Sequence, residues 1–125
     1  MNENLVSIHL FTLLAVYAFS VNLLDIAIAC TFCYVFGLLN HLHDCQVLWL
    51  SRADQTCVWT ISIIYVVHTI FCLFNFAIYD YKYLYGVLAM TILTCIAYFF
   101  VQFHPLVHFL AYTGILMYCL MRQSL

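Results

Sequence analysis

The chain contains a run of 23 residues, Cys57 through Tyr79, that includes no Asp, Glu, Lys or Arg. An apolar run of this length matches the roughly 20 residues with which an α-helix crosses the hydrocarbon core of a bilayer. Only five acidic and three basic residues occur among 125, whereas about a quarter of the residues in soluble domains are charged. Such a chain cannot cover a surface that faces water, so we expect an integral membrane protein.

The positions of the charges predict an all-α fold, a polytopic transmembrane helical bundle of four or five hydrophobic helices with no soluble domain. We expect spans at about 5–21, 25–48, 57–79, 84–102 and 106–121. Residues 5–50 cannot form one continuous helix within the bilayer, because a 46-residue helix would be about 70 Å long, more than twice the hydrocarbon thickness. We place the turn near Ser20 to Asp25. One tilted span plus an interfacial helix is the alternative. The last segment is short, and either spans or lies at the interface.

Basic residues are too few to hold phosphates, which excludes nucleic-acid binding. They are Arg52, Lys82 and Arg122, and each falls near an expected span end. Trp49 and Trp59 flank an expected loop around Arg52, as is typical of aromatic side chains at headgroup depth.

Seven cysteines are present, an odd number, and most lie inside expected helices. A disulfide framework is therefore not expected, and most of these residues are interpreted as small packing side chains. A bond between Cys45 and Cys57 across the Arg52 loop is left open.

The run from 57 to 79 has one polar face. At about 100° per residue, its polar side chains fall within one arc, while the other positions are nearly all Ile, Val, Leu or Phe. This face must meet protein, a cofactor or a ligand, and a helix-packing seam with interhelical hydrogen bonds is the structural alternative. The arc contains Ser62, Tyr65, His68, Thr69, Cys72, Asn75 and Tyr79.

His68 lies at the centre of this span, close to the bilayer midplane. An imidazole there is expected to be neutral, and neutral imidazole is an axial ligand of haem iron. A second ligand could come from His9, His108 or another subunit. A hydrogen-bonded core histidine is the alternative.

Twelve residues after His68 stand Asp80 and Tyr81, and a hydrophobic span that ends in Tyr98-Phe-Phe-Val-Gln-Phe-His104 follows. The arrangement Ser62…His68…Asp80-Tyr81 resembles the small membrane-anchor subunit of succinate dehydrogenase, respiratory complex II, over about residues 57–104. The resemblance implies that His68 ligates haem b, that Tyr81 donates a hydrogen bond to ubiquinone, and that Asp80 positions this quinone site.

The same resemblance implies a non-catalytic subunit of an oxidoreductase complex, in the mitochondrial inner membrane or a bacterial plasma membrane. Its partners would be lipids and other subunits, among them a second anchor, an iron–sulfur protein and a flavoprotein. A second placement of the family pattern runs from Cys33, in the place of the His, through Gly37 to Asp44, but it lacks the tyrosine after the Asp.

Two further groups carry metal-capable side chains. The first is His41-Leu-His43-Asp44-Cys45, at an expected membrane edge, and the second is the pair Cys30 and Cys33, one helical turn apart. In the first group, adjacent residues on a helix point in different directions, and polar residues are common at a membrane edge. The second group has no accompanying ligand pair of suitable spacing, so both groups are secondary candidates for a metal site.

His104 and His108 have the i, i+4 spacing that aims two imidazoles at one metal ion, and Asp25 is a carboxylate inside an apolar stretch. Together they resemble the zinc-dependent membrane hydrolases of the alkaline ceramidase and progestin-receptor superfamily, which implies an intramembrane lipid hydrolase. Pro105 is expected to interrupt the helix between these histidines.

A structural role is the remaining alternative. A small hydrophobic subunit of a respiratory complex, including a complex I small subunit, needs few charges and many aromatic contacts, and this composition fits. From the sequence, the complex II anchor is the favoured interpretation, and the zinc hydrolase and the accessory subunit are the alternatives.

Overall fold

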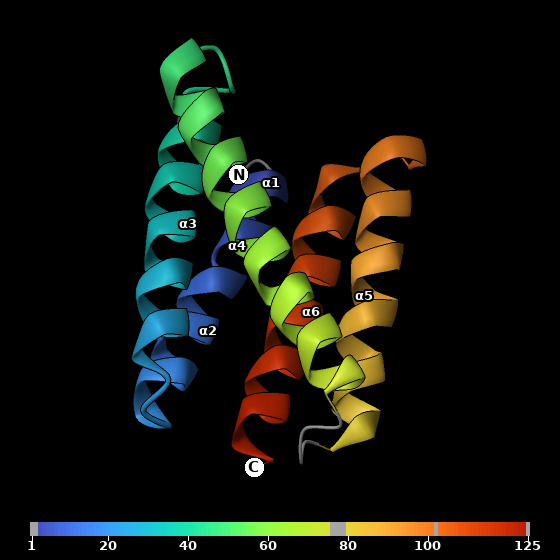
Figure 1. Cartoon of the computed structure of the whole chain (residues 1–125). Helices are drawn as coiled ribbons and strands as arrows, with labels where there is room; N and C mark the ends of the chain where they lie inside the picture. The colour runs from blue at the N-terminus through green and yellow to red at the C-terminus, as the bar shows by residue number, and fades with distance from the viewer. Residues whose placement is uncertain (1–2, 76–79, 102, 125) are drawn as a thin grey trace. The chain divides into compact units, whose positions relative to one another are not determined.

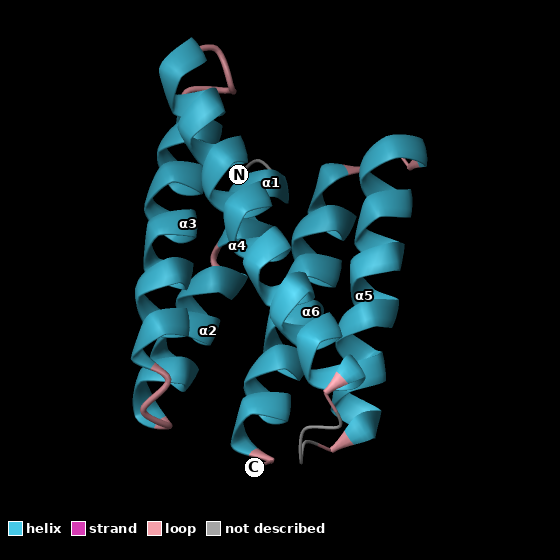
Figure 2. Cartoon of the chain, in the orientation of Figure 1, coloured by secondary structure: helices cyan, strands magenta, loops and turns pink. Residues whose placement is uncertain are grey.

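The described part of the chain is helical. The computed structural model describes residues 3–75, 80–101 and 103–124, and over these residues it contains helices and no strand (Figure 2). The all-α prediction is confirmed. The helices are α1 (Glu3–Ile8), α2 (Leu10–Ser20), α3 (Leu24–Leu42), α4 (Leu48–Phe74), α5 (Tyr81–Phe100) and α6 (His104–Gln123), labelled in Figure 1.

Four helices, α3 to α6, are long and apolar enough to cross a membrane. Residues Leu5–Ser20, which include α2 and most of α1, form a shorter apolar segment. Its 16 residues correspond to about 24 Å of helix, less than the hydrocarbon thickness of about 30 Å. The protein is therefore a polytopic transmembrane protein, and its described residues include four helices long enough to cross the membrane.

The chain divides into two compact units, residues 1–61 and 62–125, and the division falls within α4. In the first unit, α2 and α3 are joined by a turn at residues 21–23, so the break predicted between Ser20 and Asp25 is confirmed. Asn22 adopts φ 61° there, and the Leu23 amide donates to the Ala18 carbonyl at 2.8 Å. Asparagine tolerates this left-handed conformation better than most residues, which explains why the turn forms at this residue.

The expected loop around Arg52 is wrong, because α4 begins at Leu48 and both Arg52 and Asp54 are helical. The turn lies earlier, at residues 43–47, where Asp44 and Cys45 have φ values of 51° and 59° and the Cys45 amide donates to the Asn40 carbonyl at 2.9 Å. At 27 residues, α4 is about 40 Å long. It therefore exceeds the hydrocarbon thickness, which allows its charged first turns to lie outside the apolar layer.

The first unit packs α1 and α2 against α3. Leu14 and Ile26 are almost completely buried. A Cβ placed on Gly37 of α3 would lie 2.6 Å from Ile8 Cδ1 of α1, so the absence of a side chain at Gly37 allows this close approach.

The second unit packs α5 against α6 along buried residues that include Leu84 and Met121. Asp80 caps α5 by accepting from the Lys82 amide at 3.1 Å. The Asp80 amide donates to Ser124 Oγ at 2.8 Å. This bond ties the beginning of α5 to the residue that follows α6.

Candidate functional site

The polar face predicted for residues 57–79 is buried or half-buried from Ser62 to Cys72, in the part of α4 that belongs to the second unit. Within the second unit, Tyr65, Thr69 and Cys72 are 8%, 0% and 2% exposed. The opposite face consists of exposed apolar side chains and is suited to lipid. The predicted division into a lipid face and a polar face is therefore confirmed, apart from Asn75, which is exposed and donates to the Phe71 carbonyl, and Tyr79, which lies outside the described residues. The exposed apolar residues are Ile63, Ile64, Val67, Ile70, Phe71 and Phe74.

His68 of α4 is held by Tyr118 of α6. The Nδ1 atom lies 2.7 Å from the Tyr118 hydroxyl, and the rings meet edge to face at 5.8 Å. The Nε2 atom lies 3.5 Å from the Cys72 sulfur, one helical turn away. Tyr118 also stacks on Tyr65 with ring centroids 4.3 Å apart.

One arrangement of protons satisfies these contacts together. Arg122 Nη1 donates to the Tyr118 hydroxyl oxygen at 3.5 Å, and the hydroxyl can then donate its proton to His68 Nδ1. The imidazole in this arrangement is neutral and carries its proton on Nε2, which faces the Cys72 sulfur. The structure thus shows His68 as a half-buried histidine with a contact at each ring nitrogen.

A haem ligand at His68 would need the other arrangement of protons. Histidines that ligate metals donate their second ring N–H to an acceptor, so His68 would carry its proton on Nδ1 and donate it to the Tyr118 hydroxyl oxygen. Iron would bind at Nε2, so the contact between Nε2 and the Cys72 sulfur would have to be lost when the metal binds.

The residues expected to form a quinone site lie at the beginning of α5. Asp80 caps this helix, and Lys82 Nζ lies 3.5 Å from its carboxylate. Tyr81 is 45% exposed and stacks loosely on Tyr85, with ring centroids 6.3 Å apart. Ser62 is half-buried on α4. Asp80 and Tyr81 therefore contact Lys82 and Tyr85 of α5, whereas His68 contacts Tyr118 of α6 and Cys72 of α4.

His104 and His108 lie edge to face on the first turns of α6. Their ring centroids are 4.4 Å apart with an interplanar angle of 76°, and His108 is 7% exposed. The expected interruption by Pro105 is wrong. The proline stands in the first turn of α6, where its missing N–H is not needed and its fixed φ suits a helix start.

A second polar cluster lies in the first unit, where α3 ends and α4 begins. Asn40 Nδ2 donates to Asp54 Oδ2 at 3.0 Å, and His41 Nδ1 lies 3.6 Å from the Cys45 sulfur. Asn40 and His41 are both 3% exposed. The pKa of Cys45 is raised above its ordinary value, first by burial of its thiol and then by the negative charges of Asp54 and Asp44.

The cysteines all lie in the described part of the chain, and each has an unbridged thiol. Cys30 and Cys33, the second candidate pair, are buried at 1% and 2% exposure. Their surroundings match those of packing residues.

Two contributors to these clusters were missed in the sequence analysis. Tyr118 is 50 residues from His68, and only its position four residues before Arg122 marked it as a partner of a charged group. Asp54 was interpreted as part of a loop, although it bonds Asn40 from within a helix. Comparisons with protein-family models, curated proteins and solved structures find no match, so the function is argued from the geometry of these clusters alone.

Proposed function

We propose that the protein is a zinc-dependent hydrolase of the membrane, in which His104 and His108 supply two of the metal ligands. The single observation that carries this proposal is the adjacent pair of imidazoles on consecutive turns of α6, 4.4 Å apart between ring centroids. Catalytic zinc sites take three protein ligands, usually with histidine among them, and leave one position for water.

The two imidazoles suit zinc. Imidazole nitrogens are ligands that Zn²⁺ prefers, and the buried position of His108 limits competition by water. A zinc ion bound here would lower the pKa of a coordinated water towards 7 and polarise a substrate carbonyl. The apolar setting of α6 makes a lipid ester or amide the suitable substrate class.

The test is the zinc content of the protein purified in detergent. We expect about one zinc per chain in the wild type and a loss of most of it in His104→Gln and in His108→Gln. Zinc content that is absent from the wild type, or unchanged in both glutamine variants, contradicts the proposal.

A second candidate function is supported by the Tyr118–His68 hydrogen bond. It is that of a membrane-anchor subunit of an electron-transport complex of the succinate dehydrogenase type, in a mitochondrial inner membrane or a bacterial plasma membrane. His68 would hold haem b, which supplies electron transfer. The exposed Tyr81 would donate to a ubiquinone carbonyl, with Asp80 and Ser62 beside it, and a second anchor, an iron–sulfur protein and a flavoprotein would be the partners.

A reduced-minus-oxidised absorption spectrum of the membrane-purified protein with its bound partners tests this second function. We expect a b-type haem signal that disappears in His68→Ala and persists in Cys72→Ser, because only the first change removes the ligand. A spectrum without a haem signal in the wild type contradicts it. If zinc is absent as well, a non-catalytic accessory subunit of a respiratory complex is the function that remains.

A further inference from the structure

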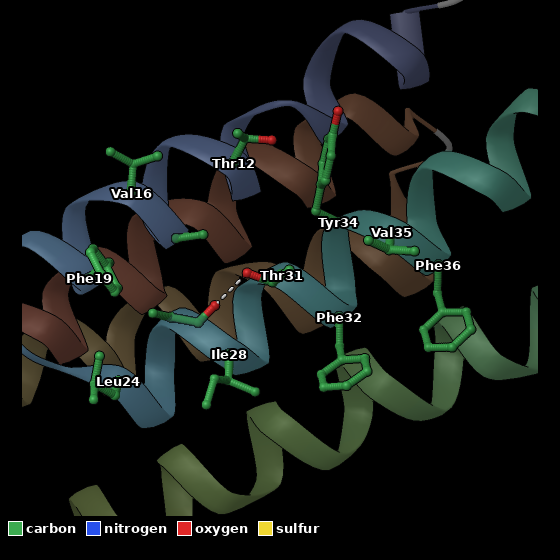
Figure 3. A pocket seen from close by; sticks show the side chains of 12 residues that line it. Thr12, Val16, Phe19, Leu24, Ile28, Thr31, Phe32, Tyr34, Val35 and Phe36 are labelled. Carbon is green, nitrogen blue, oxygen red and sulfur yellow. Dashed lines mark hydrogen bonds between the residues drawn. The ribbon is translucent and has the colours of Figure 1, made fainter.

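An apolar groove with a cavity volume of about 740 Å³ runs between α2 and α3 in the first unit (Figure 3). Val16, Phe19, Ile28 and Phe32 are among its lining residues, and no charged side chain stands among the described residues that line it. Walls of this kind do not distinguish one lipid from another by its head group. Charged side chains do so, and they are unevenly distributed between the two units.

The second unit holds most of the basic residues. Lys82 and Arg122, two of the three in the chain, lie in it, whereas Asp80 is the single one of the five acidic residues that falls there. Lys82 stands in the first turn of α5 and Arg122 in the last turn of α6, and these two helix ends lie at the same end of the unit (Figure 1). The hydrogen bond from the Asp80 amide to Ser124 Oγ, 2.8 Å long, joins them. We call this end of the second unit, with Lys82 and Arg122, the basic edge.

The basic edge lies at the depth of lipid head groups. α5 has 20 residues, about 30 Å of helix, which matches the hydrocarbon thickness, so its first turn reaches one face of the apolar layer. Tyr81 and Tyr85 are exposed there, as is typical of aromatic rings at this depth. His104 and His108 stand in the first turns of α6, at the opposite end of that helix, so the basic edge is separate from the proposed zinc ligands.

Both cations of the basic edge are at least partly exposed. The Lys82 side chain is 69% exposed, and its pair with Asp80 at 3.5 Å is a surface pair of the kind that contributes little to stability. Arg122 is half-buried and donates to the Tyr118 hydroxyl through Nη1. A guanidinium has five N–H donors in a planar fork that matches the oxygens of a phosphate. Two cations beside one carboxylate therefore favour a ligand with a net negative charge.

We propose that the basic edge binds the phosphate of an anionic phospholipid, such as phosphatidylglycerol, in the membrane leaflet that this edge faces. The Arg122 guanidinium and the Lys82 ammonium donate to the phosphate oxygens. Each Lys or Arg near the surface increases the affinity for an anionic lipid about fivefold. A zwitterionic lipid gains less, because its own ammonium offsets the charge of its phosphate. The binding needs no metal and no catalysis, so it goes beyond the function proposed for His104 and His108.

The test is native mass spectrometry of the full-length protein in detergent, titrated with phosphatidylglycerol or with phosphatidylcholine that has the same acyl chains. We expect phosphatidylglycerol to bind more tightly. Lys82→Gln and Arg122→Gln should each weaken its binding about fivefold and leave the binding of phosphatidylcholine unchanged. Asp80→Asn should strengthen the binding of phosphatidylglycerol, because it removes the opposing charge and keeps a side chain that can cap α5.

Arg52→Gln is the matched control, because Arg52 is exposed but lies in the first unit with four of the five acidic residues. This change should leave the binding of phosphatidylglycerol unchanged. Arg122→Lys keeps the charge and should retain most of the binding, which separates the loss of charge from the loss of the bond to Tyr118. Melting followed by circular dichroism confirms that each variant is folded. Equal affinities of the wild type for the two lipids, or equal losses in Arg52→Gln and Lys82→Gln, overturn the proposal.

Discussion

Replacing Tyr118 by alanine is expected to destabilise the protein by about 3 kcal/mol or more. The ring is 3% exposed, stacks on Tyr65 at 4.3 Å, and bonds His68 through its hydroxyl at 2.7 Å. Alanine removes the stacked ring and leaves both the His68 imidazole and the Arg122 guanidinium without this hydroxyl. Helices in a membrane associate by packing and by hydrogen bonds, and this substitution removes interactions of both kinds.

Tyr118→Phe separates the two contributions, because it keeps the stacked ring and removes only the hydroxyl. Its expected cost is about 1–2 kcal/mol, the cost of leaving a buried polar partner unsatisfied. Tyr85→Ala is the matched control, since Tyr85 is 57% exposed and should cost less than about 0.5 kcal/mol. The measurement is thermal unfolding in detergent micelles. A Tyr118→Ala variant no less stable than Tyr85→Ala would show that the Tyr118 cluster does not hold α4 against α6.

Local composition was sufficient to predict the helices and the lipid face of α4. Apolar runs of about 20 residues leave little choice of structure in a bilayer, and the polar arc around His68 follows from the helical period alone. The turn near Asn22 was also predictable, because polar residues there interrupt a run too long for one crossing.

The limits of sequence analysis appear where a residue's role depends on its surroundings. Arg52 and Asp54 indicated a loop, yet a helix longer than the membrane carries both of them in its first turns. Pro105 indicated an interruption, yet the same residue starts a helix when it stands in the first turn. The bond between His68 and Tyr118 joins residues 50 positions apart, and no local pattern encodes that distance.

Asn40→Leu is expected to destabilise the first unit by about 2–3 kcal/mol, because it removes a hydrogen-bond donor from a half-buried carboxylate. Asn40 Nδ2 donates to Asp54 Oδ2 at 3.0 Å, and Asn40 is 3% exposed. A hydrogen bond to a charged group is stronger than one between neutral groups, and breaking one side of such a pair costs more than replacing both.

The double variant is the sharper measurement. Asp54→Leu alone leaves the buried Asn40 amide unpaired, whereas Asn40→Leu combined with Asp54→Leu removes both polar groups and should cost less than the sum of the single changes by about 1.5 kcal/mol. Gln55→Leu, at the exposed neighbouring position of α4, is the control for adding an apolar side chain there. Additive losses in detergent unfolding would mean that Asn40 and Asp54 act independently. Coupling would show that this bond holds the end of α3 against the beginning of α4, which explains how α4 carries a carboxylate in a segment that otherwise resembles a loop.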